Sequence, residues 1–482
     1  MNRTWIPDLL FLSAVAAFLL ATLHDPFFWD AIQLGSKHAH FFYENQLRWA
    51  VLPIGIDSGH APLFGYYLAV AWSVFGKSLL VSHFALWPFV LGAVWLLLRI
   101  GIRVAGTKWG YWLVPMVVLD PVVAGQWAGL GPDVVLIFFF LLSLYGILNR
   151  LPLIIVLGIL GLCAVGMRGM MSAVALGVWC AFYVVVPRFQ ASTQRPFPWS
   201  MLLLFLPGFV FAGAFLAWHW AATGWVGYHP DSPWAPTFQR VGPWGWVRNA
   251  AIIAWRWADL GRWAEWIFLA VALWLNPAHL RRDQRWVLLL CCTICLLSPT
   301  TLLHQNVSAH RYFLPVFMVL HIWVLTCASQ LNVSRATRIG LLSLLCVSLA
   351  FGNRWIYPRG VSMTWDSTLA HRPYHTLRND MLAYLDQNGI PYQSVGTVFP
   401  ALGTGEQVSL NGDARKFSAL DWEHNQYILT SNVFNDIDLP DYDLLSKNWH
   451  LLHRIERSGV WMELYQLKKN DHDDLPLQDS LQ

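Results

Sequence analysis

The chain has 482 residues, of which 56% are hydrophobic and only 12% are charged. A soluble globular protein carries about 25% charged residues, so the composition excludes an ordinary soluble protein. The net charge of +4 is small and no basic run accompanies it, which argues against nucleic acid as a partner. The 29 Trp residues fit the aromatic belts at the two interfaces of a membrane protein.

Apolar blocks near the length that spans a bilayer, about 20 residues, follow one another along the first 352 residues. They lie near residues 9–23, 79–98, 109–125, 133–148, 151–167, 171–187, 201–220, 263–278, 286–303, 312–328 and 339–352. The shorter apolar stretch 61–75 is expected to form a helix lying in the membrane interface. We therefore predict an α-helical polytopic membrane protein with about 11 transmembrane helices.

The loop charges predict the orientation of these spans. Basic residues fall in alternate connections, among them Arg99, Arg150 and Arg338. The positive-inside rule then places the N-terminus and these loops in the cytoplasm. Ten acids lie between residues 9 and 340, and only Asp283 falls on the inner side. This one-sided distribution predicts chemistry on the outer face, where two loops, 24–60 and 221–262, are long.

The composition changes near residue 353, beyond which lie 17 of the 28 acids. Asp380–Asn388 reads as a helix that stops at Gly389, and three stretches read as strands: Ser394–Phe399, Tyr427–Ser431 and Trp461–Leu467. An odd number of spans puts this part of the chain on the outer side. We predict a soluble periplasmic α/β domain over residues 353–469, followed by an Asp-rich disordered tail, 470–482.

The first outer loop contains the most informative acids. It begins with Phe28-Trp29-Asp30 and later reads Asp57-Ser58-Gly59-His60-Ala61-Pro62-Leu63. An acid at a water–lipid boundary ionises in a region of low dielectric constant, which suits a general base that deprotonates a hydroxyl group. Asp30 equally fits the N-cap of a following helix. The residues by themselves leave both interpretations open.

These motifs, in this order, resemble the integral-membrane GT-C glycosyltransferases. The most similar branch contains the protein O-mannosyltransferases and the bacterial aminoarabinose and related sugar transferases. The likeness rests on Asp30 after the first span and on Asp57-x-x-His60-x-Pro62-Leu63. It continues through Gly131-Pro132-Asp133, Arg168 and His310-Arg311-Tyr312-Phe313-Leu314-Pro315, which is similar to an Arg-Tyr-x-x-Pro stretch at the outer face. It covers most of residues 8–330.

The resemblance implies an inverting hexosyl- or pentosyltransferase of the cell envelope, located in a bacterial inner membrane. Its donor would be a polyprenyl-phosphate sugar and its acceptor a lipid, a glycan or a protein on the non-cytoplasmic side. Asp30 would take the acceptor's proton. Asp57 is a rival for this role, because the Glu that usually follows the first acid is replaced by Ala31. His60 and Asp57 would shape the pocket, bind the acceptor or hold a divalent metal ion; no other cofactor is indicated.

Cationic side chains are needed to hold the donor phosphate. Arg311 and Arg168 are best placed at the outer ends of spans, with Tyr312 beside the first. Asp133 either belongs to the same site or simply favours the start of its helix. The segment with Arg248, Arg256 and Arg262 alternates with Trp residues. It reads either as a helix beside a lipid groove or as an interfacial anchor with snorkelling arginines.

Two other functions compete with the glycosyltransferase. A transporter or flippase for a lipid or solute is expected to have charges at mid-membrane and two related halves, whereas here the acids gather on one face. A surface-polysaccharide polymerase or ligase would have its long outer loops late in the chain rather than early. The sequence therefore favours the glycosyltransferase.

Overall fold

The structure is a computed structural model that describes residues 5–185, 198–232, 235–278, 284–306, 308–359 and 361–468. The chain divides into two compact units. The first unit is Met1–Trp355 together with Asp366–Leu369, and the second is Ile356–Trp365 together with Ala370–Gln482. Two predictions concern residues outside the described ones: the inner position of Asp283 and the disorder of the tail 470–482.

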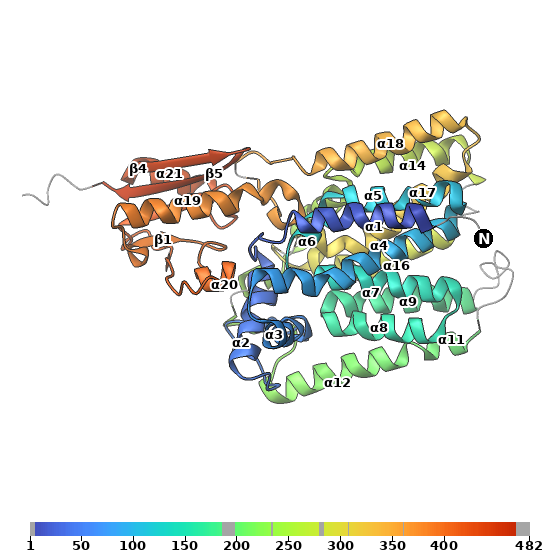
Figure 1. Ribbon diagram of the computed structural model, residues 1–482, viewed down its shortest axis with the longest axis horizontal. Helices are drawn as coiled ribbons and strands as arrows, with labels where there is room; N and C mark the ends of the chain where they lie inside the picture. The colour runs from blue at the N-terminus through green and yellow to red at the C-terminus, as the bar shows by residue number, and fades with distance from the viewer. Residues whose placement is uncertain are drawn as a thin grey trace, which may run out of the picture. The chain divides into compact units, whose positions relative to one another are not determined.

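The first unit is a bundle of helices that run roughly side by side, and the short helices α2 and α3 gather at one end of it (Figure 1). Its α-helices are α1 (Trp5–Leu20), α2 (His38–Glu44), α3 (Leu63–Phe75), α4 (Leu79–Gly110), α5 (Leu113–Leu119), α6 (Pro121–Ala128), α7 (Asp133–Asn149), α8 (Pro152–Val165), α9 (Met167–Val185), α11 (Ser200–Leu203), α12 (Leu206–Thr223), α13 (Pro243–Ala258), α14 (Trp263–Leu275), α16 (Gln284–Leu303), α17 (Leu314–Gln330) and α18 (Arg335–Gly352). Short π or 3-10 segments are η1 (Ala31–Lys37), η2 (Ala235–Phe238), η3 (His310–Phe313) and η4 (Trp365–Ser367).

Five segments of the described chain are long and apolar enough to cross a membrane: Leu79–Gly110, Ser200–Thr223, Gln284–Leu303, His310–Gln330 and Arg335–Gly352. Six shorter apolar helices accompany them. The expected class, a multi-pass helical membrane protein, is confirmed. The stretch 61–75 contains a short helix, α3, as expected.

The apolar block predicted as one span at 109–125 is broken at Asp120 into α5 and α6. The Asp120 carboxylate accepts hydrogen bonds from the amides of Val122 and Val123, and Pro121 occupies the first turn of α6. Proline disfavours helical geometry in the residue before it, and an Asp N-cap satisfies amides that a new helix start leaves free. Both residues therefore act against a continuous helix at this point.

Helix α17 forms the centre of the first unit. Every side chain from Leu314 to Ala328 is buried, and α17 packs against α4, α14, α16 and α18. A helix that is apolar on all sides can be buried in the centre of a large protein. Segment η3 leads directly into α17, so Arg311 and Tyr312 lie immediately before this buried helix.

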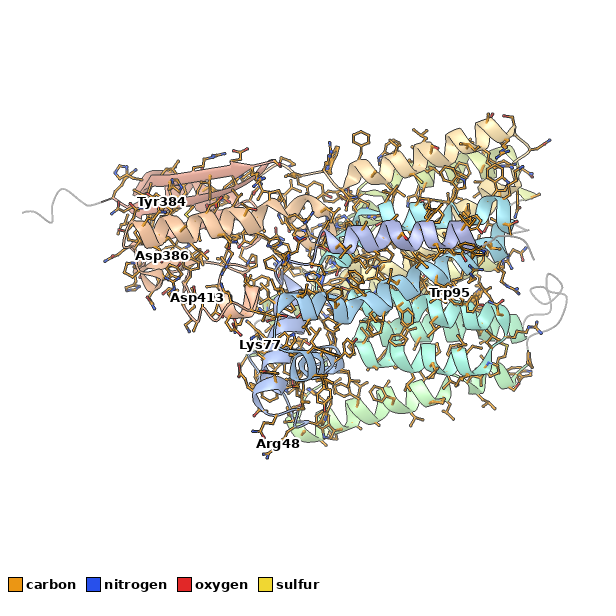
Figure 2. All side chains as sticks on the ribbon, viewed as in Figure 1. Arg48, Lys77, Trp95, Tyr384, Asp386 and Asp413 are labelled. Atoms are coloured by element: carbon orange, nitrogen blue, oxygen red, sulfur yellow. The ribbon has the colours of Figure 1, made fainter. Side chains whose placement is uncertain are left out.

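Arg99 of α4 contacts both Trp95 of the same helix and α1. Figure 2 shows Arg48 and Lys77 at the end where α2 and α3 lie, and Trp95 further along α4. The guanidinium carbon of Arg99 lies 5.8 Å from the centre of the Trp95 ring, and Arg99 also forms an ion pair with Asp8 of α1. This arginine thus joins the first helix to α4.

The second unit is a five-stranded mixed sheet with helices, which confirms the expected small α/β domain. The strand order is β2-β1-β3-β5-β4, with β1 parallel to both β2 and β3 and the other pairs antiparallel. The elements are η5 (Leu369–His371), α19 (Pro373–Gln387), η6 (Tyr392–Ser394), β1 (Val395–Thr397), α20 (Gly405–Ser409), β2 (Ser418–Ala419), β3 (Tyr427–Ser431), α21 (Leu439–Asn448), β4 (Trp449–Arg457) and β5 (Val460–Leu467).

Local sequence explains much of this unit. The two residues between β4 and β5, Ser458 and Gly459, both have positive φ angles, 51° and 81°, as a two-residue type I′ hairpin requires. Strand β4 was not predicted, because most of its side chains are exposed and apolar alternation is weak. Figure 2 shows Asp386 and Asp413 in this unit, and both carboxylates accept hydrogen bonds from Arg415.

Candidate functional site

Asp30 occupies an unusual stretch of backbone. Trp29, directly before it, has a φ angle of +53°, a left-handed conformation that bulky residues rarely adopt. Segment η1, directly after it, is a π-helix of seven residues; π-helical geometry is rare and is often found at functional sites. Asp30 stands at the N-cap position, but its side chain makes no capping hydrogen bond. Its carboxylate therefore serves something other than the helix start.

Asp30 is paired with Arg311 across the bundle. The Arg311 Nη2 donates a hydrogen bond of 2.6 Å to Asp30 Oδ2. Two further carboxylates approach the same guanidinium: Asp366 Oδ2 lies 3.0 Å from Nε, and Asp133 Oδ2 lies 3.7 Å from Nη1. A buried charge requires such partners, because removal from water is costly. Arg311 thus stands at the centre of three acids.

Arg168 is the second cation of this cluster. Its Nη1 donates a 2.7 Å hydrogen bond to Asp133 Oδ1 and a 3.4 Å hydrogen bond to the backbone oxygen of Arg311. The ring of Tyr312 lies against both guanidinium groups, 4.7 Å from the Arg168 carbon and 5.1 Å from the Arg311 carbon. Asp133 is the first residue of α7, yet its carboxylate binds the arginines rather than capping the helix.

A pocket lies beside this cluster. It is lined by Leu34, His38, His60, Ala61, Pro62, Phe64, Pro132, Asp133, Leu136, Val165, Gly166, Met167, Arg168 and Gly169. Most of its wall is apolar, with the polar groups of His38, His60, Asp133 and Arg168 set into it. Such a combination of apolar walls and a few polar groups is usual in ligand pockets.

His60 presents a neutral imidazole to this pocket. Burial lowers its pKa to about 4, and the nearby charge of Arg168 acts in the same direction. Its Nδ1 atom is buried and has no hydrogen-bond partner among the described residues. Burial likewise lowers the pKa of His38 to about 4, and the His38 Nε2 lies 2.8 Å from the oxygen of Ile56. Both rings are therefore uncharged near neutral pH.

Asp57 does not join the arginine cluster. Its Oδ2 lies 2.9 Å from His219 Nε2 at the end of α12, and its Oδ1 accepts the amide of Gly59 at 2.8 Å. Gly59 has a φ angle of +69°, and an added Cβ would lie 2.4 Å from the Gly227 oxygen. The Asp57–His219 pair therefore fixes the turn that carries His60, which assigns Asp57 a positioning contact.

Sequence reasoning missed Asp366. Its segment, Asp366–Leu369, belongs to the first unit, although it was assigned to the soluble domain. The Gln126 side chain donates a 2.7 Å hydrogen bond to the backbone oxygen of Asp366. The backbone of this segment lies so close to Gly125 that a Cβ added there would lie 2.8–3.1 Å from its atoms. A signal was available: Trp365-Asp366 after the last span repeats the Trp29-Asp30 pattern after the first.

The Trp-rich segment is not a simple interfacial anchor. Arg256 and Arg262 are buried, whereas snorkelling arginines would reach water. Arg262 Nη1 lies 2.8 Å from Asp120 Oδ2, and Asp120 together with Glu265 contacts His321 of α17. Arg256 donates to the oxygen of Ser308, and His310 Nε2 lies 2.9 Å from Asp259 Oδ2. The Arg256 and His310 contacts connect α13 and the residues after it to η3 and the residues before it. Arg248 instead donates hydrogen bonds to the side-chain oxygen of Asn249 and to the backbone oxygen of Gln305.

The geometry gives little support for a metal site. No group of three or more His, Cys, Asp or Glu side chains within the described residues is arranged to hold a metal. Asp57 and His60, the candidates from sequence, have different surroundings: Asp57 faces His219, and His60 faces the pocket.

No protein-family model matches the chain, and no curated protein matches it in sequence. Solved structures match it in fold. The structure of ArnT from Cupriavidus metallidurans bound to undecaprenyl phosphate has a TM-score of 0.52 and 10% sequence identity, over 96% of this chain and 98% of that chain. The apo structure of the same ArnT has a TM-score of 0.51 and 11% identity, over 95% and 97%.

At such low identity the likeness concerns the fold, and it extends over nearly the whole length of both chains. It includes the helical membrane unit and the C-terminal sheet. The chain therefore has the fold of ArnT, and the predicted GT-C architecture is confirmed.

Proposed function

We propose that this protein is an inverting glycosyltransferase that moves a sugar from a polyprenyl phosphate to a lipid, glycan or protein acceptor on the non-cytoplasmic face. The observation that carries the proposal is the meeting of Asp30, Asp133, Arg168 and Arg311 in one cluster beside an apolar-walled pocket. These residues come from four distant segments of the chain. The ArnT of the similar structure binds undecaprenyl phosphate, a ligand of this chemistry.

The proposed reaction is a single displacement. The acceptor hydroxyl oxygen attacks the anomeric carbon, and the bond between that carbon and the phosphate oxygen breaks. The hydroxyl proton passes to Asp30, and polyprenyl phosphate departs with the electron pair. Protonation removes the charge of Asp30 from Arg311 at the moment when the phosphate gains charge. Such stabilisation of developing charge by a fixed cation is a large term in catalysis.

Arg168 is the better placed of the two arginines for the donor phosphate in its resting state. Its side chain is 19% exposed and lines the pocket, whereas that of Arg311 is 3% exposed among three carboxylates. His60, as a neutral ring, would hydrogen-bond a sugar or acceptor hydroxyl. Asp57 would act by holding the His60 turn rather than by taking the proton.

The test is sugar transfer by purified protein in lipid, with a panel of polyprenyl-phosphate sugars and a membrane extract as acceptor. Release of polyprenyl phosphate is measured. Asp30→Asn is expected to lower the rate about 10²–10⁴-fold, the usual contribution of a general base, while Asp57→Asn weakens it less. Arg168→Lys is expected to raise the donor KM about tenfold or more, because a charge-assisted hydrogen bond and ring stacking are lost.

The matched control is Arg335→Lys, an exposed arginine at the start of α18, for which no change is expected. A full rate in Asp30→Asn would remove Asp30 from the mechanism. The reverse order of the two Asp variants would transfer the base to Asp57. Folded protein that binds and turns over none of the donors would count against the glycosyltransferase.

A further inference from the structure

The buried cluster around Arg311 contains more negative than positive charge. Three carboxylates, Asp30, Asp133 and Asp366, surround two guanidinium groups, those of Arg168 and Arg311. The side chains that hydrogen-bond to Asp366 are neutral: Gln126 of α6 donates to its backbone oxygen and Ser367 donates to its carboxylate, while Asp120 at the start of α6 is paired with Arg262. With every acid ionised, the cluster carries a formal charge of −1.

Binding of an anionic ligand increases this excess of negative charge. A phosphodiester brings one more negative charge to a site whose acids and arginines are largely buried. Excess charge in a region of low dielectric constant is costly, and a titratable group there takes up a proton instead. The inference that follows rests on the proposed function, because it supposes that the ligand of this site is a phosphate.

The three acids differ in how firmly they are held in the ionised form. Asp30 accepts a 2.6 Å hydrogen bond from Arg311, and Asp133 accepts a 2.7 Å hydrogen bond from Arg168. Asp366 lies 3.0 Å from Arg311 Nε, but the Nε proton makes no aligned hydrogen bond within the described part of the chain. Hydrogen bonds to a carboxylate favour its charged form, and the bond that Asp366 Oδ1 accepts from Ser367 is long, 3.5 Å. Asp366 is therefore the acid least committed to ionisation.

We propose that Asp366 takes up a proton when the substrate phosphate binds, so that binding of the donor is coupled to protonation of this carboxylate. The bond formed is O–H on Asp366, and the proton comes from bulk water. Arg311, relieved of one carboxylate charge, then interacts more strongly with the phosphate. Gln126 fixes the Asp366 backbone, so the segment needs no large movement for this exchange.

The titration of Asp366 agrees with this geometry. Burial raises its pKa to about 6, and the charge of Arg311 opposes this effect while Asp30 and Asp133 add to it. The unliganded carboxylate is therefore ionised at pH 8 and ready to accept a proton. Binding that requires one proton weakens as the pH rises above the pKa, by about tenfold per pH unit.

The experiment is calorimetric titration of the full-length protein in detergent with the methyl ester of a short-chain polyprenyl phosphate. This phosphodiester lacks the second phosphate ionisation near pH 6, so protons taken up come from the protein. At pH 8, in buffers with different heats of ionisation, the parent is expected to take up about one proton per ligand bound. Asp366→Asn is expected to take up almost none and to bind about 10- to 100-fold more tightly.

Asp380→Asn, a change of an exposed acid in α19, is the matched control and should behave like the parent. Binding by the parent without proton uptake would overturn the inference and leave the proposed function standing. Equal uptake in parent and Asp366→Asn would overturn it too, since the acceptor would be another group. Failure of folded parent to bind the diester at any pH would overturn the inference together with the phosphate-dependent function.

Discussion

The partner of each acid decides what that acid can do. Asp30 and Asp57 lie between α1 and α3, and both were candidates for the base. The structure pairs Asp30 with Arg311, beside the pocket, and pairs Asp57 with His219. Residue type alone gave no reason to separate them, because the partners lie 281 and 162 positions away in the chain.

The Asp57–His219 pair leads to a prediction about stability. In His219→Leu, the buried Asp57 carboxylate loses the His219 ring and keeps the Gly59 amide as its hydrogen-bond partner among the described residues. An unsatisfied buried polar group costs about 1–3 kcal/mol, so the melting temperature in detergent, followed by circular dichroism, should fall. His229→Leu is the control, since its contact with Asp231 is 3.7 Å long and the Asp231 side chain is exposed. Equal shifts in the two variants would contradict the structural role of His219.

At the scale of elements, close contacts between short helices shape the pocket. Helices α2 and α3 pack together, and this contact places His38 and Phe64 in the pocket wall. The sequence predicted α3 correctly as a short helix. It did not predict the π-helix at η1 or the left-handed Trp29, because both geometries are rare and depend on the surrounding packing.

Gly65 is where this packing is tightest. A Cβ at Gly65 would lie 2.3 Å from the His38 Cβ, whereas one at Gly213 of α12 would meet nothing within 4 Å. Gly65→Ala should therefore force α3 away from α2 and cost about 1–3 kcal/mol. Gly213→Ala should be neutral or stabilise by about 0.5–1 kcal/mol, as alanine does in a helix.

Thermal melting in detergent compares the two glycine variants, and donor KM reports on the pocket. A melting temperature for Gly65→Ala equal to that of the parent would show that α2 and α3 tolerate separation. The same change in both variants would point to the helix propensity of alanine instead of the contact with His38.

At the scale of the whole molecule, buried ion pairs connect helices that are distant in sequence. Arg262 lies before α14, Asp120 starts α6, and His321 lies in α17. Together with Glu265 they form one buried set of contacts. Loss of one member leaves an uncompensated charge, which costs about 3–5 kcal/mol in a buried pair.

Arg262→Leu should therefore reduce the fraction of protein that elutes as a single species from a sizing column after mild heating. Adding Asp120→Asn should restore part of this fraction, because Asn removes the unpaired charge and still caps α6. Arg335→Leu, at an exposed position, should leave the fraction unchanged. A double variant no better than Arg262→Leu alone would mean that the two residues are not coupled.

The sequence by itself determined the class of this protein. Hydropathy is a sum over neighbouring residues, so it gave the helical membrane unit and the change of composition near residue 353 without any knowledge of packing. The ordered motifs around Asp30, Asp133, Arg168 and Arg311 likewise pointed to the GT-C fold.

Only the tertiary structure decided how these residues combine. It brought Asp366 into contact with Arg311, turned Asp57 toward His219 and buried Arg262 against Asp120. Each of these pairs joins segments that are far apart in the chain, and each depends on which helices pack against one another. Local sequence does not specify which helices pack together. The net charge of the site and the role inferred for Asp366 therefore follow only from the folded structure.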